Sequence, residues 1–283
     1  MNATELAAKV RDLAPASHTA LKLITLLNRP ANQNQELVQL LKYDNVLTAK
    51  LLRACNSPAY GLEEPVASVE QAVMILGYLR LLRLVFAISF NGTMDKALPG
   101  YAAEAGELWR HSLVTALACE AIAKMGTPVQ TEPPIAFTAG LLHDIGKLAL
   151  NDVLESAKLE AIRSGITRDK LPCWQIEQTV IGTNHAEVGG CLMQRWKLPA
   201  EIVAAVSYHH KPTYQPGPEL SALVHVADAL AHTEDCGFAP DALAAGSAPG
   251  VLDSLQLTPD KMAGLSAVLQ QALIQVDHLM ELK

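Results

Sequence analysis

The sequence predicts an all-α protein, and three observations support this fold class. Leu, Ala, Lys, Glu and Gln recur at spacings of three to four residues, whereas β-branched residues almost never alternate with a period of two. Helix-start signals and breaks rich in proline and glycine divide the chain into helical lengths. Half of the 283 residues are hydrophobic and 18% are charged, which is enough apolar material for one large domain or two modest ones.

The first expected helix lies within MNATELAAKVRDLAP (residues 1–15), where charged and apolar residues alternate at helical spacing. This order differs from the basic and then apolar order of a secretory signal. The next clear helix start is SVEQ (residues 68–71), a capping box in which the Ser68 hydroxyl accepts the amide hydrogen of the third helical residue and Gln71 reaches back. We expect this helix to run toward Phe90.

Breaks between helices are expected where proline, glycine and other small residues cluster, namely at residues 56–65, 91–100, 126–134, 212–218 and 241–250. The break at 91–100 is the best candidate for a boundary. We therefore expect an N-terminal helical lobe over residues 1–98 and a second lobe, with a C-terminal helix, over residues 99–283. All histidines except His18 follow this break, so any site chemistry belongs to the second lobe.

Helices of the second lobe are expected to carry polar side chains on faces that are otherwise apolar. Glu107 and His111 lie one helical turn apart and share a face. The spacing of apolar residues leads in the same way to Asp228, and from residues 202 and 206 to His209 or His210. These polar groups therefore point toward the core.

The last helix has a clear start at residues 258–260, Thr-Pro-Asp. The threonine is a cap, proline suits the first helical position, and the acid faces the positive end of the helix dipole.

Three polar residues, His143, Asp144 and Lys147, interrupt the otherwise apolar stretch GLLHDIGKLAL (residues 140–150). Burying such a side chain without a partner costs about 1 to 3 kcal/mol. One interpretation is that these are core residues satisfied by hydrogen bonds. Because several imidazoles and carboxylates from separate helices point inward, a shared cation is the stronger interpretation.

The candidate ligands all offer nitrogen or oxygen and none offers a thiolate. They are Glu107, His111, His143, Asp144, His185, His209, His210 and Asp228. Such a set suits divalent iron, manganese, zinc or another divalent metal, and a set larger than four indicates two ions.

The order of His111, the doublet His143-Asp144 and Asp228 resembles the H…HD…D signature of the HD-domain superfamily, a helical fold of metal-dependent phosphohydrolases. His185 and the pair His209-His210 resemble the additional ligands of the binuclear branch, which includes the HD-GYP phosphodiesterases. Glu107 matches a carboxylate that some of these enzymes use for a further metal.

The whole chain is similar to the HDOD domain, the HD-related output domain of bacterial signalling proteins. The first lobe shows the resemblance in LLKYDNVLTAKLLRACNSPAYG and SVEQAVMILGYLRLLRLV, and the second lobe in GLLHDIGKLAL, NHAEVGGCLMQRWKLP, SYHHKP and ALVHVADALA. The resemblance runs from about Leu13 to His232. It implies an HD-like helical bundle with an N-terminal helical lobe, and a role in signal transduction with a signalling protein as partner.

Two functions remain open, and we favour a regulatory output module that binds divalent metal. The alternative is a metal-dependent phosphohydrolase or a (cyclic di-)nucleotide phosphodiesterase, in which Asp144 bridges two ions and Lys147 neutralises charge on a phosphoryl oxygen. Lys147 also has a simpler interpretation as a surface lysine. After the histidine pair the chain reads KPTYQPG (residues 211–217), where HD-GYP enzymes have an acidic residue and the GYP loop. This departure disfavours hydrolysis of cyclic di-GMP.

Composition limits the partners. A net charge of −7 disfavours nucleic acid, since the basic spot of Arg53, Arg80 and Arg83 is small. Five cysteines without a CxxC pair fit reduced thiols, and the arginines within residues 73–90 interrupt the most apolar run. We therefore expect a cytoplasmic protein without a membrane anchor, whose small ligand, if any, is a nucleotide or a phosphate.

Several other residues have simpler expected roles. His225, three positions before Asp228, is expected to support that carboxylate or to line a pocket. His232 is expected at the surface or in a satisfied hydrogen bond. Trp174, like the other two tryptophans, is expected to fill the core or a contact between lobes.

Overall fold

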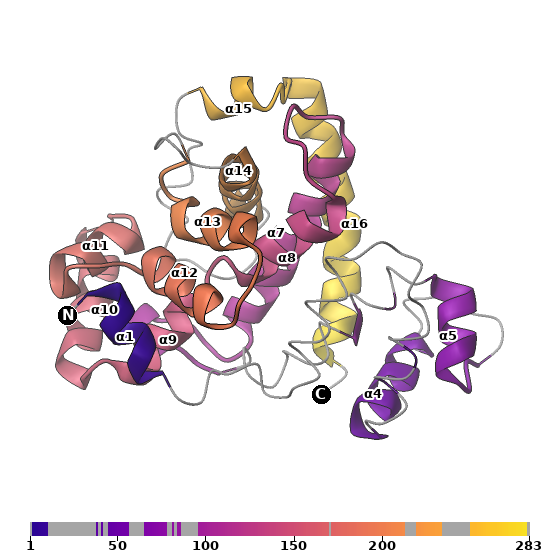
Figure 1. Ribbon diagram of the computed structural model, residues 1–283, viewed down its shortest axis with the longest axis horizontal. Coiled ribbons are helices and arrows are strands. Elements are labelled where there is room, and N and C mark those ends of the chain that lie inside the picture. Colours follow the sequence, from indigo (N-terminus) through magenta and orange to yellow (C-terminus); the bar gives the residue numbers. More distant parts are fainter. Residues whose placement is uncertain are drawn as a thin grey trace.

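A computed structural model shows a helical protein (Figure 1) and describes residues 2–10, 38, 41, 45–56, 65–77, 81, 84–85, 96–169, 171–212, 219–233 and 250–281. Within these ranges there is no strand, and the only extended pairing is an isolated bridge between Leu98 and Ala103. The all-α prediction is confirmed.

The early part of the chain contains α1 (Ala3–Lys9), α4 (Asn45–Cys55), α5 (Val69–Leu76) and the 3₁₀ turn η2 (Pro99–Tyr101). The helices that follow are α7 (Glu107–Lys124), α8 (Pro133–Leu142), α9 (Ile145–Val153), α10 (Ser156–Asp169), α11 (Cys173–Ile181), α12 (His185–Arg195), α13 (Ala200–Tyr208), α14 (Glu219–Thr233), α15 (Val251–Ser254) and α16 (Pro259–Glu281).

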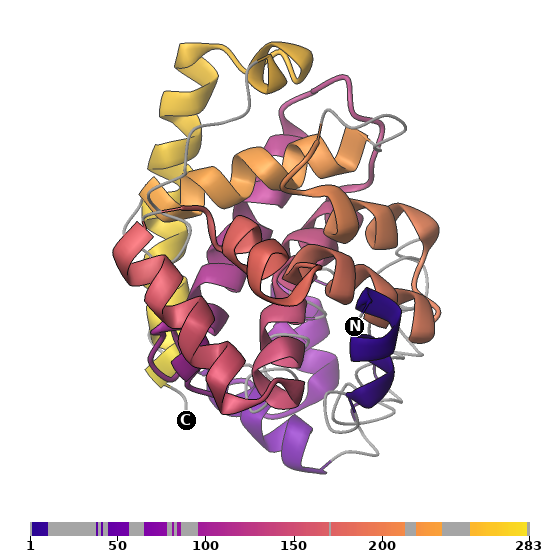
Figure 2. The same cartoon turned by 90° about the vertical axis from the view of Figure 1, so that its left-hand side faces the viewer.

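The centre of the molecule is the pair α7 and α8, against which α13, α14 and α16 pack (Figure 2). Small residues allow the two central helices to approach closely. A Cβ atom on Gly140 of α8 would lie 2.7 Å from Cys119 Sγ and 2.9 Å from Ala116 Cα, both on α7. The end of α8 is therefore carried deep into the core, where the chain turns into α9.

The N-terminal helix α1 lies against α12 and α9, at the opposite end of the molecule from α4 and α5 (Figure 1). Asn2 and Glu5 form a capping box at its start, and Leu6 and Ala7 are buried. Arg195 of α12 donates a hydrogen bond to the Ala7 carbonyl. The expected lobe of residues 1–98 thus includes a helix, α1, that packs on the second lobe, because the short apolar face of α1 is buried against α9 and α12. The boundary near residue 98 stays a prediction.

The helix expected from Ser68 toward Phe90 begins as predicted but is interrupted early. The Gln71 amide donates to Ser68 Oγ, and Gln71 Oε1 accepts from the Ala67 amide, one residue earlier than a standard capping box. Helix α5 ends at Gly77, whose φ of 76° is a conformation that glycine adopts without strain. Residues 81, 84 and 85 are helical again. Arg80 and Arg83 lie outside the described residues.

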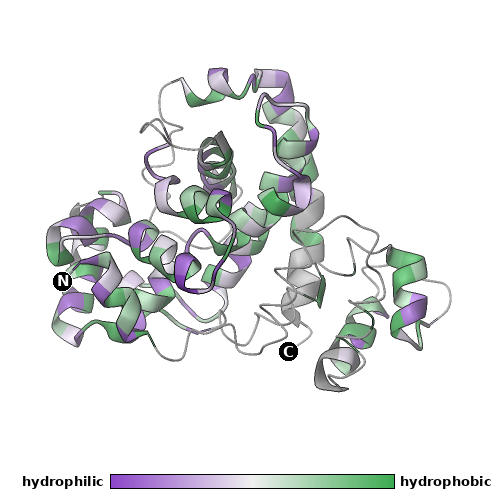
Figure 3. Cartoon of the chain, in the orientation of Figure 1, coloured by the Kyte–Doolittle hydropathy of each residue, from purple (hydrophilic) through white to green (hydrophobic). Residues whose placement is uncertain are grey.

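Hydrophobic and hydrophilic residues are interspersed along the helices (Figure 3), and many of the hydrophobic ones are buried. An exception is α5, where Met74 is 76% exposed and Ile75 is 50% exposed. The predicted start of α16 is confirmed, with the Lys261 amide donating to Thr258 Oγ1 and Pro259 at the first helical position. None of the helices in the described ranges combines the length and the apolarity that a membrane span needs.

Candidate metal centre

The junction of α8 and α9 places two polar residues in the middle of the core. His143 ends α8 and Asp144 caps α9, and their side chains are 0% and 1% exposed. Every residue from Thr138 to Leu150 is buried, so nothing at this junction reaches bulk water. The apolar stretch noted in the sequence is therefore a buried turn built to present this doublet.

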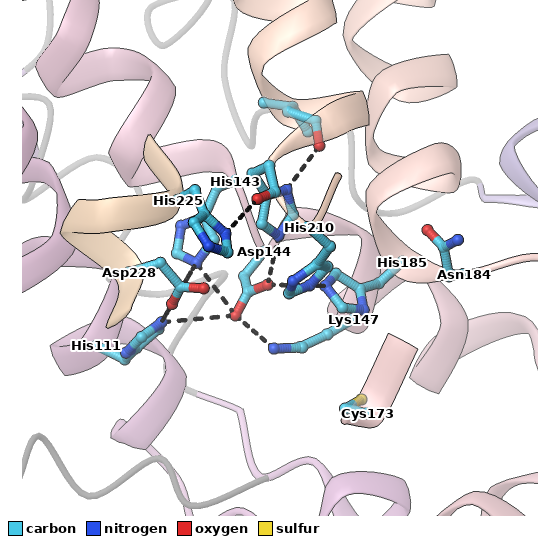
Figure 4. A network of polar contacts seen from close by, with 12 residues as sticks. His111, His143, Asp144, Lys147, Cys173, Asn184, His185, His210, His225 and Asp228 are labelled. Atoms are coloured by element: carbon cyan, nitrogen blue, oxygen red, sulfur yellow. Dashed lines mark hydrogen bonds and ion pairs between the residues drawn. The ribbon is translucent and has the colours of Figure 1, made fainter. Parts of the chain in front are cut away.

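Asp144 lies between two groups of histidines, and each of its oxygens faces one group (Figure 4). Oδ2 lies 3.4 Å from His143 Nε2 and 3.8 Å from His111 Nε2. Oδ1 lies 3.2 Å from His185 Nε2 and 3.9 Å from His209 Nε2. One carboxylate thus connects side chains from α7, from the junction of α8 and α9, from α12 and from the end of α13.

The histidines present the same nitrogen to the cluster. The Nδ1 atoms of His143 and His209 lie 2.7 Å from the carbonyl oxygens of Gly140 and Val206, respectively. A carbonyl only accepts, so Nδ1 carries the proton in both rings. Nε2 is then left to face Asp144 as a potential ligand atom, which is how metal-binding histidines are usually oriented.

His185 is oriented by Glu177, a fully buried residue of α11 that the sequence analysis missed. Its Oε2 accepts from both the backbone amide and Nδ1 of His185, each at 2.7 Å. Its Oε1 accepts from the Tyr101 hydroxyl at 2.7 Å and from Cys173 Sγ at 3.3 Å. No spacing rule connects Glu177 to residues 76 positions earlier and 8 positions later, so only the fold reveals this carboxylate.

The group that contains His111 and His143 also includes Asp228 and His232 from α14. Asp228 Oδ1 lies 3.0 Å from His111 Nε2, 3.5 Å from His143 Nε2 and 3.3 Å from His232 Nε2. The His232 ring stacks on His111, with centroids 4.6 Å apart. The sequence analysis assigned His232 no role in the site, although its position one helical turn after Asp228 was a usable signal.

His225 supports the backbone at His209. Its Nδ1 lies 2.8 Å from the backbone carbonyl of that residue. Lys147 is buried, and its Nζ donates to Asp144 Oδ2 at 2.7 Å. This pairing excludes the interpretation of Lys147 as a surface lysine.

The histidines of the cluster differ in pKa, which is raised in some rings and lowered in others. Burial opposes ionisation, but the negative charge of Asp144 prevails and raises the pKa of His143 to about 10. Burial likewise opposes ionisation of Asp144, yet the charges of His143 and Lys147 hold its pKa well below the usual value. Burial and the neighbouring histidines lower the pKa of His209 to about 3. Its ring is therefore neutral at physiological pH, as a ligand must be.

The donor set fits divalent metal. The described residues contain overlapping groups of donor atoms within 4.8 Å of one another, namely Asp144 with His185, His209 and His210; His111 with His143 and Asp144; His111 with Asp228 and His232; and His143 with His209 and Asp228. Asp144 Oδ1 and His209 Nε2 are buried and make no hydrogen bond, although both face the cluster. Buried polar atoms are normally satisfied, and a coordinated cation would satisfy both.

The structure does not bring the Glu107 carboxylate into these groups. Its Oε2 accepts from the Glu104 amide at 2.9 Å, at the start of α7. Among the described residues it belongs to no set of donors within 4.8 Å of one another. The other seven candidate ligands from the sequence each belong to at least one such set.

The protein is thus a helical protein whose helices direct a set of histidines and aspartates into a buried centre. The chain belongs to the HDOD domain family, whose profile matches residues 13–212 and so crosses the expected boundary between the lobes.

The chain is also similar to individual proteins, one of which is named as an HDOD domain protein. An HDOD domain protein of unknown function from Geobacter sulfurreducens is 26% identical, with a TM-score of 0.78 over 99% of this chain and 98% of that one. A Marinobacter aquaeolei protein, provisionally named a signal transduction protein, is 25% identical, with a TM-score of 0.76 over 95% of this chain and 59% of that one. An uncharacterized Treponema pallidum protein is 23% identical over 76% of this chain, which spans only 40% of that protein's length.

Proposed function

We propose that the protein is a cytoplasmic signal-transduction module of bacteria that binds two divalent metal ions in its histidine–aspartate centre and acts on a signalling protein partner. The observation that carries the metal centre is the shared carboxylate of Asp144, whose two oxygens face two groups of Nε2 atoms. One ion would be held by His111, His143, Asp144 and Asp228, and the other by Asp144, His185, His209 and His210. Similarity to the Marinobacter aquaeolei protein supports the signalling role.

Metal analysis of the purified full chain tests this proposal. We expect about two divalent ions per chain, and a melting temperature that falls by about 4 °C or more after chelation because bound metal stabilises only the folded state. Asp144→Ala should lose both ions, since both groups share this carboxylate.

Glu107→Gln is the matched control, and it should keep the metal because Glu107 lies outside the donor groups. A metal content near zero, together with a melting temperature that chelation does not change, would refute the metal centre.

Phosphate-ester hydrolysis is the second candidate function, and the burial of Lys147 beside Asp144 favours it. Two divalent ions in this centre would supply Lewis acidity toward a phosphoryl oxygen. The Lys147 ammonium would hold Asp144 in place and add positive charge next to it. A buried cation of this kind stabilises a developing negative charge more strongly than an exposed one.

Generic phosphomonoester and phosphodiester substrates distinguish the two functions. If the protein is an enzyme, Lys147→Gln should reduce kcat about 100-fold, whereas Lys197→Gln, at an exposed lysine between α12 and α13, should not. Equal turnover by the wild-type chain and Asp144→Ala would rule out hydrolysis at this centre.

A further inference from the structure

A cavity of about 480 Å³ lies between α1, α11, α12 and α13, beside the metal centre, and shares His210 with it. Its walls include Ala3 of α1, Trp174 of α11, Gln194 of α12 and Ser207 of α13. Small-molecule sites commonly have volumes of about 300 to 1,000 Å³. The cavity is therefore of a size that holds one small organic molecule.

His210 forms the boundary between this cavity and the centre. Its ring lines the cavity, and its Nε2 lies 2.8 Å from His185 Nε2. His210 is partly buried, whereas His111, His143, His185 and His209 are fully buried. A molecule in the cavity would thus touch the centre through His210.

The wall beside His210 combines a flat aromatic surface with a cation. The Trp174 ring lies nearly parallel to the His210 ring, with centroids 6.0 Å apart and an interplanar angle of 20°. Lys211 Nζ lies 4.9 Å from the centroid of the Trp174 ring, and both residues line the cavity. An indole offers a stacking face for a planar ring, and an ammonium group binds phosphate as a point charge.

The lining also contains one acidic residue, Glu187, which has a hydrogen-bond partner at the start of its own helix. Glu187 lies in the first turn of α12, where its carboxylate accepts from the Thr183 hydroxyl at 2.5 Å. The same turn contributes Asn184 and Ala186 to the wall, and the amino end of a helix carries a partial positive charge.

We propose that this cavity binds a small molecule that has a planar aromatic ring and a phosphate group, with the ring on Trp174 and the phosphate near Lys211. A nucleoside monophosphate has this chemistry and fits the available volume. The proposal deepens the proposed function and rests on it for the link from His210 to the metal centre. Trp174 and Lys211, which would contact the ring and the phosphate, lie outside the donor set.

Calorimetric titration of the full chain, with and without added metal, tests the proposal with AMP, adenosine and ribose 5-phosphate as probes. We expect AMP to bind at least about 10-fold more tightly than either half of the molecule, because one binding event fixes both groups. Trp174→Ala should weaken AMP binding by about fivefold or more, whereas Trp174→Phe, which keeps a ring, should retain most of the affinity.

Lys211→Gln should bring the affinity for AMP close to that for adenosine, and Lys197→Gln, which removes an exposed lysine outside the cavity, should change nothing. The proposal is wrong if AMP binding does not saturate in the millimolar range, or if Trp174→Ala and Lys211→Gln bind AMP as the wild-type chain does. Metal content is measured on the same samples. Metal without AMP binding would refute only the cavity proposal, and AMP binding without metal would refute only the metal centre.

Discussion

Gly146→Ala is expected to lower the free energy of unfolding by about 3 kcal/mol or more. Gly146 lies in the first turn of α9, where α9 crosses the start of α12. An added Cβ atom would lie 1.9 Å from the backbone oxygen of His185 and 3.0 Å from the Gly189 amide nitrogen. Backbone atoms cannot rotate away as a side chain can, so the two helices must separate.

This separation would also displace a ligand of the proposed metal centre, because the atom in collision belongs to His185 itself. Urea denaturation measures the loss of stability, and metal analysis of the folded fraction should show less bound metal. The matched control is Gly264→Ala on α16, where an added Cβ atom has nothing within 4 Å. That change should stabilise the protein slightly, since alanine restricts the unfolded chain. Equal stabilities for the two variants would contradict the close contact of α9 with α12.

Glu177→Gln is expected to have the second-largest effect. The carboxylate accepts hydrogen bonds from the backbone and side chain of His185, from Tyr101 and from Cys173, all in the core. An amide of the same shape replaces one acceptor oxygen with an NH2 group, which would face donors. We expect a loss of about 2 to 4 kcal/mol in the free energy of unfolding, because buried groups lose their partners.

Metal binding gives a second measurement that a purely structural role would not change. In Glu177→Gln a single amide oxygen must serve donors that two carboxylate oxygens served, so Nδ1 of His185 is held less firmly as a donor and Nε2 is aimed less firmly at Asp144. We expect the affinity of the second ion to fall about 10- to 100-fold, as for other residues that orient a ligand histidine.

Tyr101→Phe is the control, since it removes one of the same hydrogen bonds but leaves His185 held. It should cost about 1 kcal/mol and leave metal affinity nearly unchanged. If both variants bind metal equally, Glu177 does not position His185.

Local sequence signals predicted the fold class and several helix starts, because these depend on neighbouring residues. The cap at Ser68 and the start at Pro259 are examples. The predicted end of α5 was wrong. The apolar pattern continues through Gly77, and only the backbone shows the positive φ that stops the helix. Seven of the eight candidate ligands lie together in the structure, since polar residues at helical spacing on apolar faces must point into the core.

The sequence by itself therefore determined that the protein is helical, that it belongs with the HDOD domains, and which side chains point inward. Only the tertiary structure decided that Asp144 faces both histidine groups, that Glu177 holds His185 and that Glu107 stays apart. It also showed the cavity beside Trp174. The physical reason is that periodicity specifies the direction of a side chain relative to its own helix, whereas contacts between residues far apart in the chain depend on how the helices pack.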